Sequence, residues 1–147
     1  MIISYTRDDG SLERVSTDDL SAIEAASIEE VVGELWRVVE DRLRGQDPTA
    51  MRAVLWAVRR RSEPSLKFEA FDVPGWRRRL KARIERAEID DVLDNIIAES
   101  MAKNEDAAIE TMLPHLRKLA DSPDDVTAAL DSLGKGHLVK DRQGSAA

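Results

Sequence analysis

Residues 47–71 read DPTAMRAVLWAVRRRSEPSLKFEAF, and this stretch decides how the surrounding chain folds. Asp47 is a natural N-cap, and Pro48 suits the first helical position because the N–H that proline lacks has no helical partner there. The pattern therefore predicts a helix that begins at Pro48. Its apolar side chains recur at i, i+3, i+4 and i+7 and are expected to face a core: Met51, Val54, Leu55 and Val58.

Trp56 lies away from this apolar stripe, in the sector of the helix that also holds Arg52, Arg59 and Arg60. A contact that buries the stripe therefore leaves the indole uncovered. Two interpretations are open: the ring and the arginines bind a partner, or the ring packs inside the chain under the C-terminal helices. Because aromatic and arginine side chains dominate many protein interfaces, the candidate partner-binding residues are Arg52, Trp56, Arg59 and Arg60.

The N-terminus has the pattern of a β-hairpin. Two runs with strand character, 2–6 and 12–16, flank Asp9-Gly10, which provides the positive φ of a tight turn. Because two strands alone are marginally stable, the hairpin must pack on helices or pair with another chain. Its unpaired edge favours self-association.

The residues after the hairpin predict helices. Residues 17–19 are expected to form a short helical turn, and the sequence SIEE at 27–30 has the spacing of a capping box that opens a helix through about Leu43. The link from there to Pro48 is short, so these two helices should be an antiparallel pair. The alternating apolar side chains of residues 66–73 predict an extended segment that lays aromatic rings on this pair.

The second half of the chain predicts further helices. One covers 76–86, and the apolar stripe changes phase near Glu88, which means either that the helix breaks there or that a long helix offers one half to a neighbour. Another begins at Asn104 and runs to about Leu119, and Pro114 in its middle predicts a kink or a division. A last short helix over 122–134 is expected to end at its glycine. The remaining tryptophans are assigned to the core: Trp36 and Trp76.

Together these patterns predict a mainly α-helical fold, in which an N-terminal β-hairpin packs on a helical bundle and is followed by a C-terminal helical extension and a mobile tail. Residues 1–73 are expected to hold the hairpin, the helical pair and the extended segment. Residues 74–133 hold the C-terminal helices, in the same domain or in a second small one. Residues 134–147 have too little apolar surface to offset ordering, which predicts a disordered tail.

Composition and charge limit the class of protein. Cysteine is absent, and the longest apolar run, 53–58, is far shorter than the roughly 20 residues that span a bilayer. We therefore expect a cytoplasmic protein with no membrane segment. The net charge is −7, distributed as −7 over residues 1–51, +7 over 52–86 and −7 over 87–147. The basic centre either pairs with the chain's own acidic ends or faces an acidic partner.

Residues for catalysis or for cofactor or metal binding are not combined in any pattern that indicates such chemistry. His115 and His137 are far apart in the sequence, and the acidic group at 90–94 is typical of a solvated helix surface. Gly134-Lys135-Gly136 follows no strand and lacks the earlier glycine of a phosphate-binding loop. The sequence therefore predicts a protein that is not an enzyme and has no cofactor.

The segment WRRRLKARIER, 76–86, is the strongest indication of nucleic-acid binding, with six cationic side chains against one carboxylate. The cations spread around the expected helix, however, and the acidic flanking regions repel nucleic acid. Pairing of this helix with the chain's own acidic helices is the favoured interpretation.

The first half of the chain resembles tail assembly chaperones of long-tailed phages that infect high-GC bacteria. The residues that carry the resemblance are the DDG hairpin, the acidic helix SAIEAASIEEVVGELW and the block GQDPTAMRAVLWAVRRRSEPSLKFEAFDV. The resemblance implies a cytoplasmic protein, absent from the mature virion, that binds the long helical tape-measure protein and recruits tail tube subunits. It also implies a second, longer form made by a ribosomal frameshift, for which the codons of 134–136 would be the slippery site.

Two other classes remain open. A virion connector or minor tail component would share the self-associating hairpin and the charge blocks. A nucleic-acid-binding accessory protein is the third possibility.

Overall fold

The computed structural model describes residues 1–103 and 108–144, and it divides into two compact units. Unit 1 comprises Met1–Arg83, and unit 2 begins at Ile84. The structure is mainly helical, with an antiparallel hairpin at the N-terminus, which confirms the predicted fold class. The boundary lies ten residues after the predicted one at 73/74, because the segment between them completes the sheet of unit 1.

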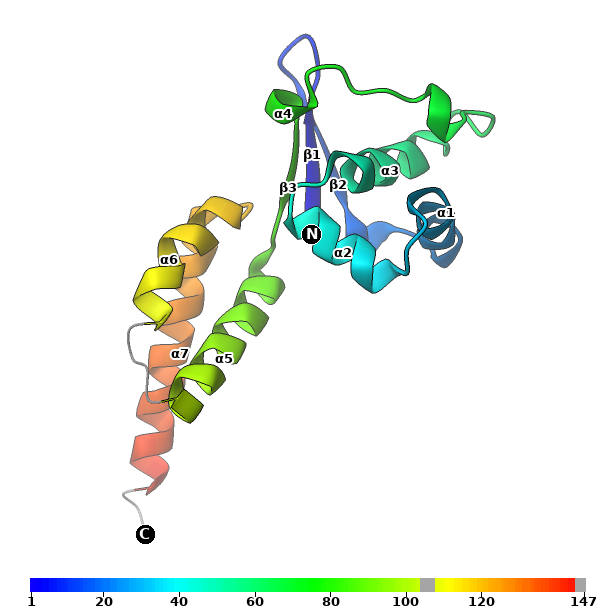
Figure 1. Ribbon diagram of the computed structural model, residues 1–147. Coiled ribbons are helices and arrows are strands. Elements are labelled where there is room, and N and C mark those ends of the chain that lie inside the picture. Colours follow the sequence, from blue (N-terminus) through cyan, green and yellow to red (C-terminus); the bar gives the residue numbers. More distant parts are fainter. Residues whose placement is uncertain (104–107, 145–147) are drawn as a thin grey trace. The chain divides into compact units, whose positions relative to one another are not determined.

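Unit 1 combines a small sheet with short helices (Figure 1). Its strands are β1 (Ile2–Thr6), β2 (Leu12–Ser16) and β3 (Leu80–Arg83). Its α-helices are α1 (Ala22–Val32), α2 (Trp36–Arg44), α3 (Pro48–Arg59) and α4 (Trp76–Arg79), and two 3₁₀ turns, η1 (Thr17–Asp19) and η2 (Phe68–Ala70), lie between them. The hairpin, the helical turn at 17–19 and the helix that begins at Pro48 were all predicted.

The sheet has three strands in the order β2-β1-β3, so β1 is central. The helix predicted over 76–86 is wrong: α4 is only four residues long, and β3 follows it directly. The physical reason is the free edge of the hairpin, which needs a third strand. Leu80 and Ala82 alternate with half-buried cations, so the segment buries two side chains on one face while it pairs with β1.

Gln46 covers the outer edge of β3. Its side-chain amide donates to the carbonyl oxygen of Ala82 at 2.8 Å and accepts from the Ala82 N–H at 2.9 Å, as a neighbouring strand would. Gln46 has φ +59°, a left-handed conformation that few non-glycine residues adopt. The edge at Ala82 is therefore occupied by this chain rather than open to another.

The predicted helix from 27 to Leu43 is wrong, because two helices occupy this region. The capping box is formed by Ser21 and Glu24, six residues earlier than expected, and Gly33 ends α1 with φ +77°. A residue in this conformation cannot continue a right-handed helix. The chain then restarts as α2, with Trp36 at its first position.

Trp36 and Trp76 are only partly buried, so their assignment to the core is wrong. Each opens a short helix, where a residue faces fewer neighbours than in a helix centre. The core of unit 1 instead lies between α3 and the sheet, since α3 contacts all three strands. Its largest fully buried side chains come from the sheet and from α1, α2 and α3: Ile3, Ile28, Val39, Leu43, Met51, Val54, Leu55 and Leu80.

Unit 2 is a group of three helices that contact one another: α5 (Arg86–Lys103), α6 (Ala108–Leu119) and α7 (Pro123–Gly144). The start of α5 confirms a break near Glu88. Ile84 forms an isolated parallel bridge with Ala120, which ties the start of the unit to the α6–α7 link. The helix α6 is not divided at Pro114.

The helix α7 continues through Gly134 to Gly144, so the predicted helix end at Gly134 is wrong. The disorder predicted for 134–147 stays a prediction, and its last three residues, 145–147, lie outside the described residues. The predicted start of the preceding helix at Asn104 also lies outside them. In the part of the chain that the structure describes, no helix has the length and apolar character needed to cross a membrane.

Candidate partner-binding groove

The helix α3 is built as its sequence predicts. The Asp47 carboxylate accepts from the backbone N–H groups of Thr49 and Ala50, at 2.7 and 3.2 Å. Three of the four stripe residues are fully buried, and Val58 is partly exposed near the end of the helix. This rigid helix positions the arginine and tryptophan side chains that follow.

Trp56 is buried inside unit 1, with 5% of its surface exposed. Its cover is the segment 64–73, which returns from α3 and is called here the return segment. The indole N–H donates to the Leu66 carbonyl oxygen at 3.0 Å, and the ring meets Phe68 edge to face at 5.5 Å. The interpretation that the ring packs inside the chain is therefore correct, but the C-terminal helices do not provide the cover.

Arg52 holds the other end of this cover. Its Nη1 donates to the carbonyl oxygens of Phe68 and Phe71 at 2.7 and 2.6 Å, and its guanidinium lies 3.7 Å from the centre of the Phe68 ring. These contacts confirm that the segment after Pro64 lays an aromatic ring on the helices. Because these contacts occupy the Arg52 side chain within unit 1, Arg52 is not available for the partner contact that was predicted for it.

The three arginines at the end of α3 have different surroundings. Arg59 forms a 2.7 Å ion pair with Glu13 of β2, so its charge is neutralised on the sheet. Arg61 forms a two-bond ion pair with Glu24 at the start of α1, at 2.8 and 2.9 Å. Among the described residues, Arg60 donates only to the Pro64 carbonyl oxygen, through two long contacts of 3.4 Å, and it lies over the Trp56 ring at 4.9 Å.

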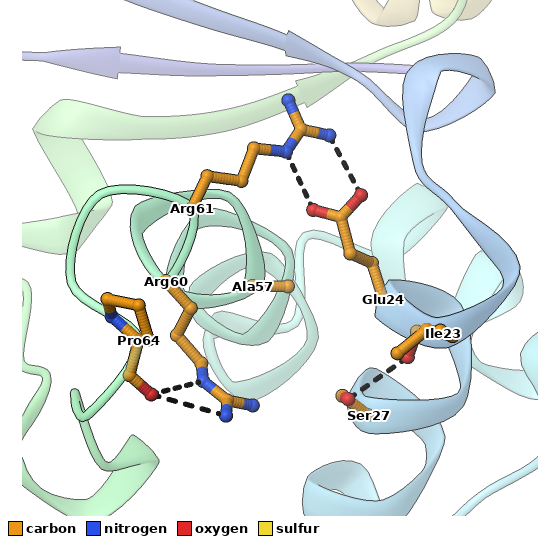
Figure 2. A pocket seen from close by; sticks show the side chains of 7 residues that line it. All are labelled: Ile23, Glu24, Ser27, Ala57, Arg60, Arg61 and Pro64. Atoms are coloured by element: carbon orange, nitrogen blue, oxygen red, sulfur yellow. Dashed lines mark hydrogen bonds and ion pairs between the residues drawn. The ribbon is translucent and has the colours of Figure 1, made fainter.

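A hollow of about 250 Å³ opens between the first turns of α1 and the end of α3. Figure 2 shows Ile23 and Ser27 on one side, Pro64 and Arg60 on the other, and Ala57 between them. The Arg61–Glu24 ion pair closes one end of it. Ile23 lies at the rim of this hollow and is 80% exposed.

A second hollow of about 290 Å³ adjoins the first, since Ser27, Arg60 and Pro64 line both. It continues along α1 to Val31 and along the return segment to Glu69. We call the two hollows together the α1–α3 groove. One wall is a helix and the other is the return segment held by Arg52 and Trp56.

Glu24 fixes the closed end of the groove electrostatically. The hydrogen bonds from Arg61, assisted by the backbone N–H of Ser21, lower the pKa of the Glu24 carboxyl to about 2. The carboxylate is thus charged at any pH near neutral. It also accepts from the Ser21 N–H at 2.9 Å, so the same side chain caps α1 and pairs with α3.

The four candidate residues separate into two pairs. Trp56 and Arg60 line the groove, whereas Arg52 and Arg59 are held by contacts within unit 1. Ile23 and Glu24 were not among the predicted site residues, because the predicted helix began at Ser27. The signal was present as a second Ser-x-x-Glu pattern at 21–24, immediately before apolar residues.

The basic segment 76–86 does not form one cationic helix face. Arg77 stacks on Trp76 at 5.5 Å, Arg79 pairs with Asp8, and Lys81 and Arg83 belong to β3. Unit 1 holds 15 Lys+Arg and 15 Asp+Glu, whereas unit 2, from residue 84, holds 7 and 14. The basic centre is thus balanced within unit 1, partly through ion pairs with the acidic N-terminal region.

The other candidate chemical groups are not brought together. Within the described ranges, no cluster of three or more His, Cys, Asp or Glu side chains is arranged to hold a metal ion. Residues 134–136 lie within α7 rather than in a loop before a helix. A comparison of the chain with known protein families, with curated proteins and with solved structures finds no match.

Proposed function

We propose that this protein is a tail assembly chaperone that binds the tape-measure protein and recruits tail tube subunits during phage tail assembly. The proposal rests on the sequence resemblance and on the open groove in the part of the chain that carries it. The residues that carry the resemblance all lie in unit 1. In the block that begins at Asp47, Arg52 and Trp56 of α3 hold the return segment through hydrogen bonds to its carbonyl groups. The return segment and the end of α3 form one wall of the α1–α3 groove.

The groove supports a role in binding rather than in catalysis. Its lining combines apolar and aromatic side chains with Arg60, and aromatic and arginine side chains are enriched at protein interfaces. We propose that the protein acts in the host cytoplasm and leaves before the tail is complete, without cofactor or metal. Codons for 134–136 that form a slippery run, with an overlapping frame beyond them, would support a longer frameshifted form.

The direct test is binding. The protein and the tape-measure protein encoded by the same phage are co-expressed, and the complex is isolated through a tag on either partner. We expect a complex that also retains tail tube protein when this third protein is added. Failure of the tape-measure protein to bind at micromolar concentrations would overturn the proposal.

A virion component is the second candidate, because the outer strand β2 exposes an apolar side chain, Leu12, over 61% of its surface. An exposed edge strand of this kind favours permanent assembly with other subunits. Mass spectrometry of purified particles separates the two roles. A chaperone is absent from the particles, whereas a connector or minor tail component is present in fixed stoichiometry.

A further inference from the structure

We propose that the α1–α3 groove binds an amphipathic helix of the partner, which places an apolar side chain between Ile23 and Ala57 and a carboxylate against Arg60. This inference rests on the proposed function only for the identity of the partner. The kind of occupant, an amphipathic helix with a carboxylate, follows from the chemistry of the groove. The experiments below test this inference and the proposed function separately.

The apolar part of the proposal follows from the rim and the floor of the first hollow. Ala57 is buried at the floor, while Ile23 stands 80% exposed above it and Pro64 faces it from the return segment. Covering an exposed isoleucine removes apolar surface from water, at roughly 25 cal/mol per Å². Ile23 does not serve the core of unit 1, so the groove offers it to a partner.

The charged part follows from the pairing of the arginines. Arg61 and Glu24 neutralise each other at the closed end of the groove, and they are already bonded through both guanidinium contacts. Within unit 1, Arg60 is held only by two weak contacts to a carbonyl oxygen and by the face of Trp56. Among the groove charges of the first hollow, Arg60 is therefore the one whose charge an incoming carboxylate can balance.

The shape of the groove favours a helix. Ile23, Ser27 and Val31 are four residues apart and lie on one face of α1, along which the groove extends. At 1.5 Å per residue this wall is about 12 Å long, which is two turns of a partner helix. At the far end the two carboxylates Glu30 and Glu69 outnumber the single cation Lys67, so a second carboxylate is disfavoured there, which orients the partner helix with its acidic end toward Arg60.

The first experiment uses synthetic helical peptides that carry leucines at i and i+4 and one glutamate beside them, and a matched peptide with lysine in place of the glutamate. Binding to the full-length protein is measured by fluorescence anisotropy of the labelled peptide. We expect the glutamate peptide to bind at least tenfold more tightly than the lysine peptide. Equal binding of the two peptides, or no binding of either, overturns the inference.

The second experiment compares groove variants with matched controls. Ile23→Glu and Arg60→Glu should each weaken binding of the glutamate peptide and of the tape-measure protein at least tenfold. Leu35→Glu changes an apolar side chain that is similarly exposed, at 75%, outside the groove, and Arg78→Glu changes an exposed arginine outside it. Both controls should alter binding less than twofold.

The outcomes separate the inference from the proposed function. If the tape-measure protein binds equally to parent and groove variants, the groove inference is wrong and the chaperone proposal stands. If the glutamate peptide binds as expected while the tape-measure protein does not bind, the chaperone proposal is wrong and the groove inference stands. If the parent is an oligomer in sedimentation analysis and Ile23→Glu dissociates it, the occupant is a second copy and the inference is overturned.

Discussion

At the residue scale, the arginine and tryptophan side chains of α3 hold the fold of unit 1 together. Arg52 and Trp56 both bond to carbonyl groups of the return segment, which has few backbone hydrogen bonds of its own besides short turns. A buried indole N–H without an acceptor is unfavourable, so the Leu66 carbonyl oxygen and Trp56 depend on each other. The pattern Arg-x-x-x-Trp on one helix face thus serves to fix a distant segment.

Replacement of Trp56 tests this role. Trp56→Ala should lower the free energy of unfolding by about 3–5 kcal/mol, because it removes a buried aromatic ring and leaves a cavity under the return segment. Trp76→Ala is the control, since Trp76 is only partly buried and should cost much less. The measurement is chemical denaturation followed by circular dichroism. A loss for Trp56→Ala no larger than that for Trp76→Ala would mean that the ring does not stabilise the fold.

The Glu24–Arg61 ion pair predicts a dependence of stability on pH. The pKa of Glu24 is lowered in the folded state from 4.5 to about 2, so the contribution of the pair is complete above pH 4.5 and is lost as the pH falls toward 2. We expect a loss of about 1 kcal/mol, because Arg61 is half exposed and solvent screens the pair. Glu24→Gln should remove this part of the acid sensitivity. Identical pH profiles for parent and variant between pH 5 and 2 would contradict the assignment.

At the scale of elements, the predictions succeeded where the local sequence decides the structure. The cap at Asp47, the turn at Asp9-Gly10 and the stripe of α3 are local features, and each was confirmed. The strand β3 could not be predicted from its own residues, because its pairing with β1 joins positions about 80 residues apart. Long-range pairing overrides the helical preference of the arginine-rich segment.

The candidate site was predicted only in part, because some of its residues lie on a helix set by local sequence and the others do not. Two of the four residues, Trp56 and Arg60, line the groove, and they lie on the helix that was predicted correctly. The opposite wall was missed because the division between α1 and α2 depends on one glycine. Both Gly33 and Gly45 follow helices in the sequence, and only the structure shows which of them adopts a positive φ.

Substitution of these two glycines tests the division between α1 and α2. Gly33→Ala should destabilise the protein by about 1–2 kcal/mol, because an alanine at φ +77° is strained even though its Cβ meets no atom within 4 Å. Gly45→Ala is the matched control: its φ is −78°, and the added Cβ would make only ordinary contacts at 3.5 and 3.6 Å. We expect Gly45→Ala to change stability by less than about 0.5 kcal/mol. Equal effects of the two substitutions in thermal denaturation would show that α1 does not need this break.

At the scale of the whole molecule, charge and tryptophan content divide between the two units. Unit 1 is electrically balanced and holds all three tryptophans, whereas unit 2 carries the whole net charge of −7. Like-charge repulsion between molecules opposes aggregation, so unit 2 should keep the chain dispersed at neutral pH. Tryptophan fluorescence, in turn, reports directly on unit 1.

A fragment of residues 1–83 tests this division. It should retain the tryptophan emission spectrum of the full chain, because its core and all three strands lie within these residues. Near pH 7 it should precipitate at lower concentration than the full chain, since it has lost the negative charge of unit 2. An emission maximum shifted to that of an unfolded chain would show that unit 1 depends on unit 2 to fold.

The position of β3 in the sequence has a consequence for synthesis on the ribosome. Until residues 80–83 have left the exit tunnel, the inner edge of β1 lacks a neighbour, and the amide of Gln46 has no strand to bond. The nascent hairpin therefore keeps one side open while residues 17–83 are translated, a period in which another chain can occupy that side. Rare codons placed between the hairpin and β3 would lengthen this interval and increase misassembly, without any change in the encoded protein.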